Sequence, residues 1–232
     1  MKRILNITML LASFVILAVG CKKHTIIEPD PNPIDTILRV GNIYCEDGRV
    51  IDPYNYKKAG MTNAAGVIFW VNDSLDVEDK AYLVSLSDAY SGHSGGKCIW
   101  SDTLISTGVS TSITAMNGAA NTSVLTSFQN KNGGYFEAKE RALQYGWRIN
   151  SWYLPSAAQL VELYHNKETV LAALECCNGD GFEQVWYWTS TEDNDGTESK
   201  KYNAYIVSLV EGYIQAELKT NLHMVRPVKT IK

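Results

Sequence analysis

An acidic stretch near the C-terminus holds the densest group of oxygen ligands in this sequence. Residues 191–198 place four carboxylates and one amide within seven residues. Hard oxygen ligands at this density can hold Ca²⁺, although an EF-hand loop also requires a bidentate Glu at its twelfth position. A solvated acidic hairpin loop is therefore the favoured interpretation. No cofactor is expected; Glu192, Asp193, Asn194 and Asp195 are nevertheless the candidate ligand-binding residues of this stretch, and Ca²⁺ is the alternative that they would take.

Aromatic residues form a second group of candidates. The sequence has six Trp and thirteen Tyr residues, and Trp186, Tyr187 and Trp188 are consecutive. Side chains alternate between the two faces of a strand, so the two tryptophans share a face. Core packing of both is the favoured interpretation. A tryptophan left at the surface would instead offer a platform for a sugar ring or a partner protein, so Trp188 and Tyr202 are the aromatic ligand-binding candidates.

The cysteines allow two interpretations, disulfide bonds or buried free thiols. Besides Cys21, the sequence has Cys45, Cys98, Cys176 and Cys177. In an oxidising compartment four cysteines permit three disulfide pairings, between which the sequence does not choose, and buried free thiols are the alternative. No C-x-x-C or paired histidine spacing predicts zinc.

The N-terminus has the layout of a secretory signal. Lys2 and Arg3 precede an uncharged apolar run, residues 4–19, which is shorter than the roughly 20 residues of a membrane-spanning helix. The run ends in Ala-Val-Gly-Cys, which resembles the bacterial lipobox, in which the cysteine becomes the lipidated first residue. We therefore expect a lipoprotein signal at residues 1–20 and acyl chains such as palmitate on Cys21. An ordinary cleaved signal is the alternative.

The length of 232 residues allows one sizeable domain besides the signal. Residues 21–37 are rich in proline and predict an extended tether, so the domain spans residues 38–232. Cleavage removes two of the 21 basic residues and none of the 25 acidic ones, which leaves a net charge of about −6. No cluster of cations is present, and this excludes nucleic acid as an expected partner. The expected location is the outer membrane, facing the periplasm or the cell surface.

A helix start in the middle of the chain is the element around which the domain is predicted to form. Ser156 is a good N-cap, and Gln159 stands three residues later, as a capping box requires. Leu160 and Leu163 follow at helical spacing and predict an apolar face. We expect this central helix to dock on a sheet made from the C-terminal third.

The remaining patterns predict an α+β domain with strands at both ends and helices in the middle. Residues 90–132 show no helical periodicity and predict a long irregular region. Residue 227 is a proline, which confines the last strand to an edge or to one-sided pairing. The predicted strands are residues 40–44, 49–51, 65–71, 81–86, 185–190, 202–209, 213–218 and 224–228, and the further helices are residues 135–145 and 168–174.

Three short motifs occur in a recognisable order. They are Asn-Gly-Ala-Ala-Asn-Thr at residues 117–122, Trp-Tyr-Leu-Pro-Ser at 152–156 and Val-Arg-Pro-Val at 225–228. Their order resembles the C-terminal domain of bacterial collagen-like adhesins and related surface lipoproteins, a branch of the C-type-lectin-like fold. Over residues 115–229 this resemblance implies two to three helices flanking a twisted antiparallel sheet, and binding rather than catalysis. Residues 38–114 would add the first strands and an insertion.

These observations predict a membrane-anchored extracytoplasmic binding module or adhesin that recognises glycan or protein ligands. No nucleophile elbow, P-loop or dinucleotide fingerprint is present. Two alternatives remain open. One is an enzyme on the same fold, such as a formylglycine-generating-type oxidase, for which Cys176 and Cys177 form the only close thiol pair. The other is a structural component of a surface fibre.

The anchoring prediction is tested by Cys21→Ser. Without the thiol no acyl chain can be attached, so we expect the variant to leave the membrane fraction or to stall in processing. Phase separation in a nonionic detergent measures this partitioning. A variant that still enters the detergent phase would show that Cys21 is not the anchor.

Overall fold

The computed structural model describes residues 37–72, 74, 78–90, 94–146, 151–183, 185–194, 197 and 200–232. The expected signal, Cys21 and all but the last residue of the tether lie outside these residues. Within the described residues, no helix combines the length and the apolar character needed to cross a membrane.

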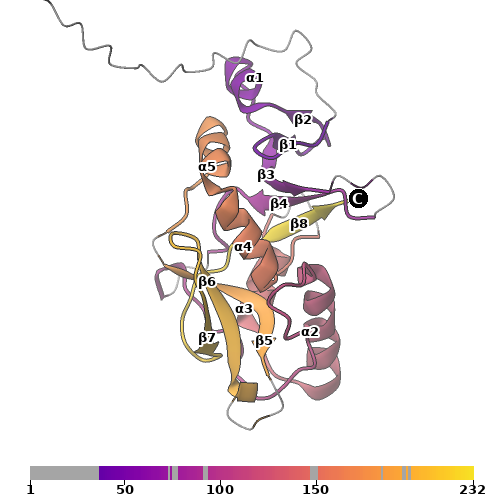
Figure 1. Ribbon diagram of the computed structural model, residues 1–232, viewed down its shortest axis with the longest axis vertical. Coiled ribbons are helices and arrows are strands. Elements are labelled where there is room, and N and C mark those ends of the chain that lie inside the picture. The colour runs from indigo at the N-terminus through magenta and orange to yellow at the C-terminus, as the bar shows by residue number, and fades with distance from the viewer. Residues whose placement is uncertain are drawn as a thin grey trace, which may run out of the picture.

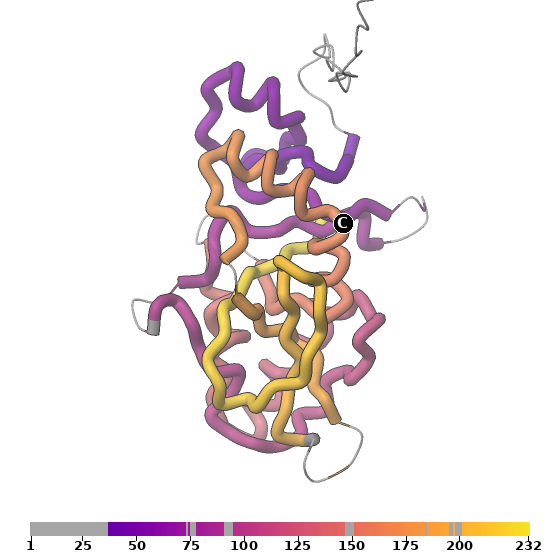
Figure 2. The backbone as a smooth tube through the Cα atoms, turned by 60° about the vertical axis from the view of Figure 1, so that its left-hand side comes forward, coloured from indigo at the N-terminus to yellow at the C-terminus, as the bar shows by residue number. Residues whose placement is uncertain are grey.

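Two antiparallel sheets organise the described chain, and they confirm the α+β class (Figure 1). The first sheet has the order β2 (Val50–Ile51), β1 (Ile43–Cys45), β3 (Ala64–Val71), β4 (Ala81–Ser85) and β8 (Val228–Ile231). The second sheet has the order β5 (Trp186–Asp193), β6 (Asn203–Ser208) and β7 (Ile214–Leu218). Figure 2 shows the first described residues, in indigo, at one end of the long axis and the second sheet toward the other.

The central helix was predicted correctly. The α-helices of the described chain are α1 (Pro53–Lys58), α2 (Gly118–Asn132), α3 (Glu137–Gln144), α4 (Ala157–His165) and α5 (Lys167–Cys176). Helix α4 packs against β5 and β6 of the second sheet and also against β3 of the first. The Ser156 hydroxyl accepts from the Gln159 N–H at 3.4 Å, and the Ser156 N–H donates to the Gln159 side chain at 3.0 Å. Leu160 and Leu163 are fully buried, so the capping box and the apolar face are both confirmed.

The second sheet separates two hydrophobic clusters. Tyr187 and Val207 project toward α4 and join the cluster that α4 shares with the first sheet. Trp188 and Ile206 project to the opposite face and pack in a second cluster that contains Trp100. Both faces of β5 and β6 are therefore buried, as the alternation of side chains along a strand allows.

Helix α2 lies in the region that the sequence analysis predicted to be irregular, so this prediction was wrong. The buried face of α2 includes Asn121 and Thr122 beside Leu125. Asn121 donates from its side-chain amide to the Ser190 carbonyl at 3.2 Å. Because polar residues on the buried face bond to distant backbone, the helix has no apolar periodicity that could reveal it.

Gly118 sets how closely α2 approaches α4. A Cβ atom at Gly118 would lie 2.3 Å from the Gln159 side-chain oxygen and 2.7 Å from the Ser156 nitrogen. Only a residue without a side chain allows this approach. The capping box of α4 is therefore covered by the first turn of α2.

Helix α1 was also missed, although a local signal was present. The Asp52 side chain accepts from the Asn55 N–H at 3.0 Å, and Pro53 occupies the first helical position. An aspartate followed by proline is a typical helix start. The short helix follows the predicted hairpin of β1 and β2, in which Ile43 pairs with Ile51.

The last strand differs from its prediction in place and partner. We expected residues 224–228 to extend the C-terminal meander, whereas β8 starts at Val228 and pairs antiparallel with β4 at the edge of the first sheet. The preceding Pro227 has no N–H to donate, and its carbonyl accepts from the Ser85 N–H at 3.1 Å. The predicted edge position is confirmed, and strands β3 to β7 and helices α3 and α5 lie where they were predicted, within a few residues at their ends.

Two substitutions measure how much α4 contributes to stability. Ser156→Ala removes the cap and should lower the free energy of unfolding by about 1 kcal/mol. Leu160→Ala leaves a cavity in a fully buried site and should cost about 2–5 kcal/mol. Denaturant titration measures both, with Leu143→Ala as the control because Leu143 of α3 is 41% exposed. If Leu160→Ala lowered the free energy of unfolding no more than Leu143→Ala, the result would contradict a core position for α4.

Candidate functional site

The acidic stretch contributes Glu192 to a buried ion pair. Strand β5 continues through Glu192 and Asp193. Glu192 is fully buried, its two carboxylate oxygens each accept from the Thr107 N–H at 3.2 Å, and it pairs with the buried Lys219. For Glu192, ligand binding and a solvated loop are thus both wrong, while Asp195 lies outside the described residues.

Lys219 shows why this carboxylate is buried. Its ammonium donates to Glu192, to the Ile105 carbonyl at 2.7 Å and to the Lys201 carbonyl at 2.8 Å, which uses all three of its protons. The Trp100 ring lies 4.7 Å from the same nitrogen. Burial lowers the pKa of Lys219, and the charge of Glu192 opposes this shift. The pair ties the segment around residue 105 to the second sheet.

The other polar candidates near this pair do not assemble into a described site. Asp193 accepts from the Tyr205 hydroxyl at 3.0 Å, and the Asn194 amide donates to the Ser106 hydroxyl at 2.6 Å. Tyr202 is half-buried in a short 3₁₀ helix, η2 (Lys200–Tyr202). Among the residues whose positions are described, no group of three His, Cys, Asp or Glu side chains could hold a metal ion.

Trp188 belongs to the core. Its side chain is fully buried, and its indole N–H donates to the Cys98 carbonyl at 2.8 Å. The His223 ring meets it edge-on, with 4.9 Å between the ring centres. The core interpretation is confirmed for Trp188, for which the surface platform is wrong, while Trp186 is partly buried against the same cluster.

The four cysteines of the described chain are free thiols. Cys177 is buried and Cys176 is half-buried. Burial raises the pKa of Cys177 to about 11 and that of Cys98 to about 12. A reactive thiol requires a lowered pKa, so Cys177 has the opposite of the environment that a thiol-dependent oxidase needs.

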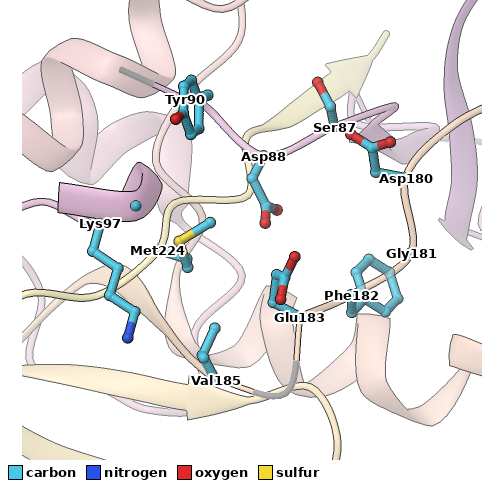
Figure 3. A pocket seen from close by; sticks show the side chains of 11 residues that line it. Ser87, Asp88, Tyr90, Lys97, Asp180, Gly181, Phe182, Glu183, Val185 and Met224 are labelled. Carbon is cyan, nitrogen blue, oxygen red and sulfur yellow. The ribbon is translucent and has the colours of Figure 1, made fainter. Parts of the chain in front are cut away.

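A cavity of about 700 Å³ opens between two segments that the sequence analysis did not single out. One wall follows β4 and the other precedes β5, and Figure 3 shows the side chains that line it. The first wall contributes Ser87, Asp88, Tyr90, Gly95 and Lys97, the second Asp180, Gly181, Phe182, Glu183 and Val185, and Met224 lies between them.

Arg226 ties the two walls together. Its side chain is fully buried, and one terminal nitrogen donates to the Asp88 carboxylate at 3.1 Å and to the Gly181 carbonyl at 3.3 Å. The other donates to the Asp180 carbonyl at 2.9 Å. The guanidinium also lies 5.0 Å from the centre of the Phe182 ring. One buried cation therefore positions both sides of the cavity.

Tyr187 of β5 supplies the second link. Its hydroxyl donates to the other Asp88 oxygen at 3.2 Å and accepts from the Glu183 N–H at 2.8 Å. Burial raises the pKa of Asp88, Arg226 opposes that shift, and the like charge of Glu183 adds to it. Asp88 is thus a preorganised carboxylate, because the buried side chains of Arg226 and Tyr187 hold it in place.

The open side of the cavity offers acceptors and an aromatic ring. Figure 3 shows the carboxylates of Asp88 and Glu183 extending toward one another. Tyr90 is 70% exposed at the rim, and its ring packs over Gly96. Gly96 has a φ of +84°, and a Cβ atom there would lie 2.9 Å from that ring. Carboxylates beside an exposed tyrosine can hold a polar ligand through hydrogen bonds and ring contact.

Comparison with known proteins gives a likeness of fold. No family model matches the chain, and no curated protein matches it. The crystal structure of a fimbrial protein from Bacteroides ovatus is similar with a TM-score of 0.59 and 18% sequence identity. The likeness covers 82% of this chain and 48% of the fimbrial protein, so the chain spans about half of that protein's length. The C-type-lectin-like assignment itself stays a prediction.

The buried pair of Glu192 and Lys219 makes a stability prediction. Lys219→Met leaves the Glu192 carboxylate buried without its cation, so we expect a loss of about 3–5 kcal/mol in the free energy of unfolding. Lys219→Met combined with Glu192→Leu should recover most of that loss. Chemical denaturation measures the free energy of unfolding of the parent protein, the single variant and the double variant. Lys57→Met is the control, because Lys57 is an exposed lysine of α1. A single variant as stable as the control would contradict the structural role of the pair.

Proposed function

We propose that this chain is a lipid-anchored extracytoplasmic binding module, an adhesin that recognises a glycan or protein ligand in the cavity that Asp88, Tyr90 and Glu183 line. The observation that carries the proposal is Asp88, a carboxylate fixed by Arg226 and Tyr187 and facing Glu183 across an open cavity. A preformed concave site with a few fixed polar groups is typical of ligand binding. The proposal assigns binding rather than catalysis.

The N-terminal segment supports a position at the bacterial surface or in the periplasm. Cys21 would carry the acyl chains in the outer membrane, and the proline-rich residues 22–37 would separate membrane and domain. Sixteen residues in an extended proline-rich conformation reach about 50 Å. That length would let the cavity reach a ligand beyond the lipid headgroups. The fold likeness to a fimbrial protein also favours a surface role.

A structural component of a surface fibre is the second candidate. It is favoured by that same likeness and by the position of β7, which in the described chain pairs with β6 alone at the edge of its sheet. An edge strand presents unpaired backbone groups to which another strand can add. The two candidates differ in what the protein contacts, because a fibre component binds copies of itself or of related subunits.

The binding proposal is tested with a soluble protein that starts at Lys22, screened against glycans and extracellular-matrix proteins. We expect a captured ligand whose affinity falls about tenfold or more in Tyr90→Ala, because the change removes the ring at the rim of the cavity. Tyr54→Ala is the matched control, since Tyr54 is 56% exposed on α1 and does not line the cavity.

Absence of any ligand, or equal affinity in the two tyrosine variants, would refute the cavity as the binding site. Sedimentation of the same protein at increasing concentration tests the fibre candidate. Concentration-dependent polymers without ligand capture would favour that candidate instead.

A further inference from the structure

The charges of the cavity are unevenly distributed. Three carboxylates, those of Asp88, Asp180 and Glu183, line it together with one ammonium, that of Lys97. Figure 3 shows Lys97 extending away from Asp88, on the side of Val185. Among the described residues Asp88 forms its ion pair with Arg226, and Lys97 forms none with Asp88 or Glu183. The lysine of the cavity therefore does not neutralise the facing carboxylates.

Asp88 keeps hydrogen-bonding capacity toward the cavity. Each of its oxygens accepts one hydrogen bond from a buried side chain, one from Arg226 and the other from Tyr187. A carboxylate oxygen accepts two bonds, so each retains one lone pair. Arg226 also donates to two backbone carbonyls of the opposite wall.

Glu183 faces Asp88 with its carboxylate free for a ligand. Within the described residues its backbone N–H donates to Tyr187, while its side chain makes no hydrogen bond or ion pair. Two carboxylates that point toward one another repel unless a cation lies between them. A group with several N–H donors and a positive charge meets both requirements.

The rest of the lining fits the stem of such a group. Met224 and Val185 offer apolar surface beside the carboxylates, and Phe182 and Tyr90 add aromatic rings. Lysine and arginine carry their charge at the end of an apolar chain, which packs on surface of this kind.

Resting on the proposed function, we infer that the cavity takes a lysine or arginine side chain of a protein ligand, with its cationic head between Asp88 and Glu183. The ligand class is therefore a basic protein segment, and Lys97 marks the side on which the cation does not sit.

The test titrates the mature chain, solubilised in a neutral detergent, with small probes followed by calorimetry. The probes are the Nα-acetyl methylamides of lysine, arginine and norleucine, and glucosamine. We expect saturable binding of the lysine and arginine probes that weakens with added salt, and no binding of norleucine, which has an alkyl side chain without a charge.

Glu183→Gln keeps the shape of the side chain and removes its charge. We expect it to lower the affinity for the cationic probes about tenfold. Glu168→Gln is the matched control, because Glu168 is an exposed acid of α5 outside the cavity. Glu183 is exposed as well, so both variants should melt as the parent protein does.

Three results would overturn the inference. In the first, the norleucine probe binds with the same affinity as the lysine probe. In the second, Glu183→Gln and Glu168→Gln bind the cationic probes with equal affinity. In the third, glucosamine is the preferred probe, which would assign an amino sugar instead. None of them refutes the proposed function, which is decided by the ligand screen and by Tyr90→Ala.

Discussion

A guanidinium that is wholly removed from water must find acceptors, and the need of Arg226 for them shapes this protein. Leaving such a charge unpaired would cost several kcal/mol. Its partners come from two distant parts of the chain, the Asp88 carboxylate after β4 and the carbonyls of Asp180 and Gly181 before β5. The two segments that accept hydrogen bonds from Arg226 are the two walls of the cavity. The candidate site is therefore a consequence of burying this cation.

Lys219 applies the same rule on the other side of the second sheet. Its ammonium collects Glu192 of β5, the Ile105 carbonyl and the Lys201 carbonyl. Glu192 of the acidic stretch therefore has a structural role. At the cavity, by contrast, Glu183 is exposed. Burial beside Lys219, rather than the density of acidic residues, thus decides that Glu192 has a structural role.

A sheet buried on both faces, with a buried cation at each side, gives a rigid body on which loops can present a ligand site. Among the described residues, β7 pairs with β6 alone and lies at the edge of its sheet. A ligand at the cavity and a strand added at β7 would use different parts of this body, because β7 does not line the cavity.

The range of an interaction along the chain decides how much of this protein could be predicted from its sequence. The capping box of α4 joins Ser156 to Gln159, three residues apart, and it was predicted correctly together with the α+β class and most strands. Arg226 and Asp88 are 138 residues apart, and Glu192 and Lys219 are 27 apart, so neither pair left a local pattern. Helix α2 was missed because its buried face is polar and bonds to distant backbone. Only tertiary structure decides such contacts, because a polar side chain becomes a core residue or a ligand according to the partner that folding brings to it.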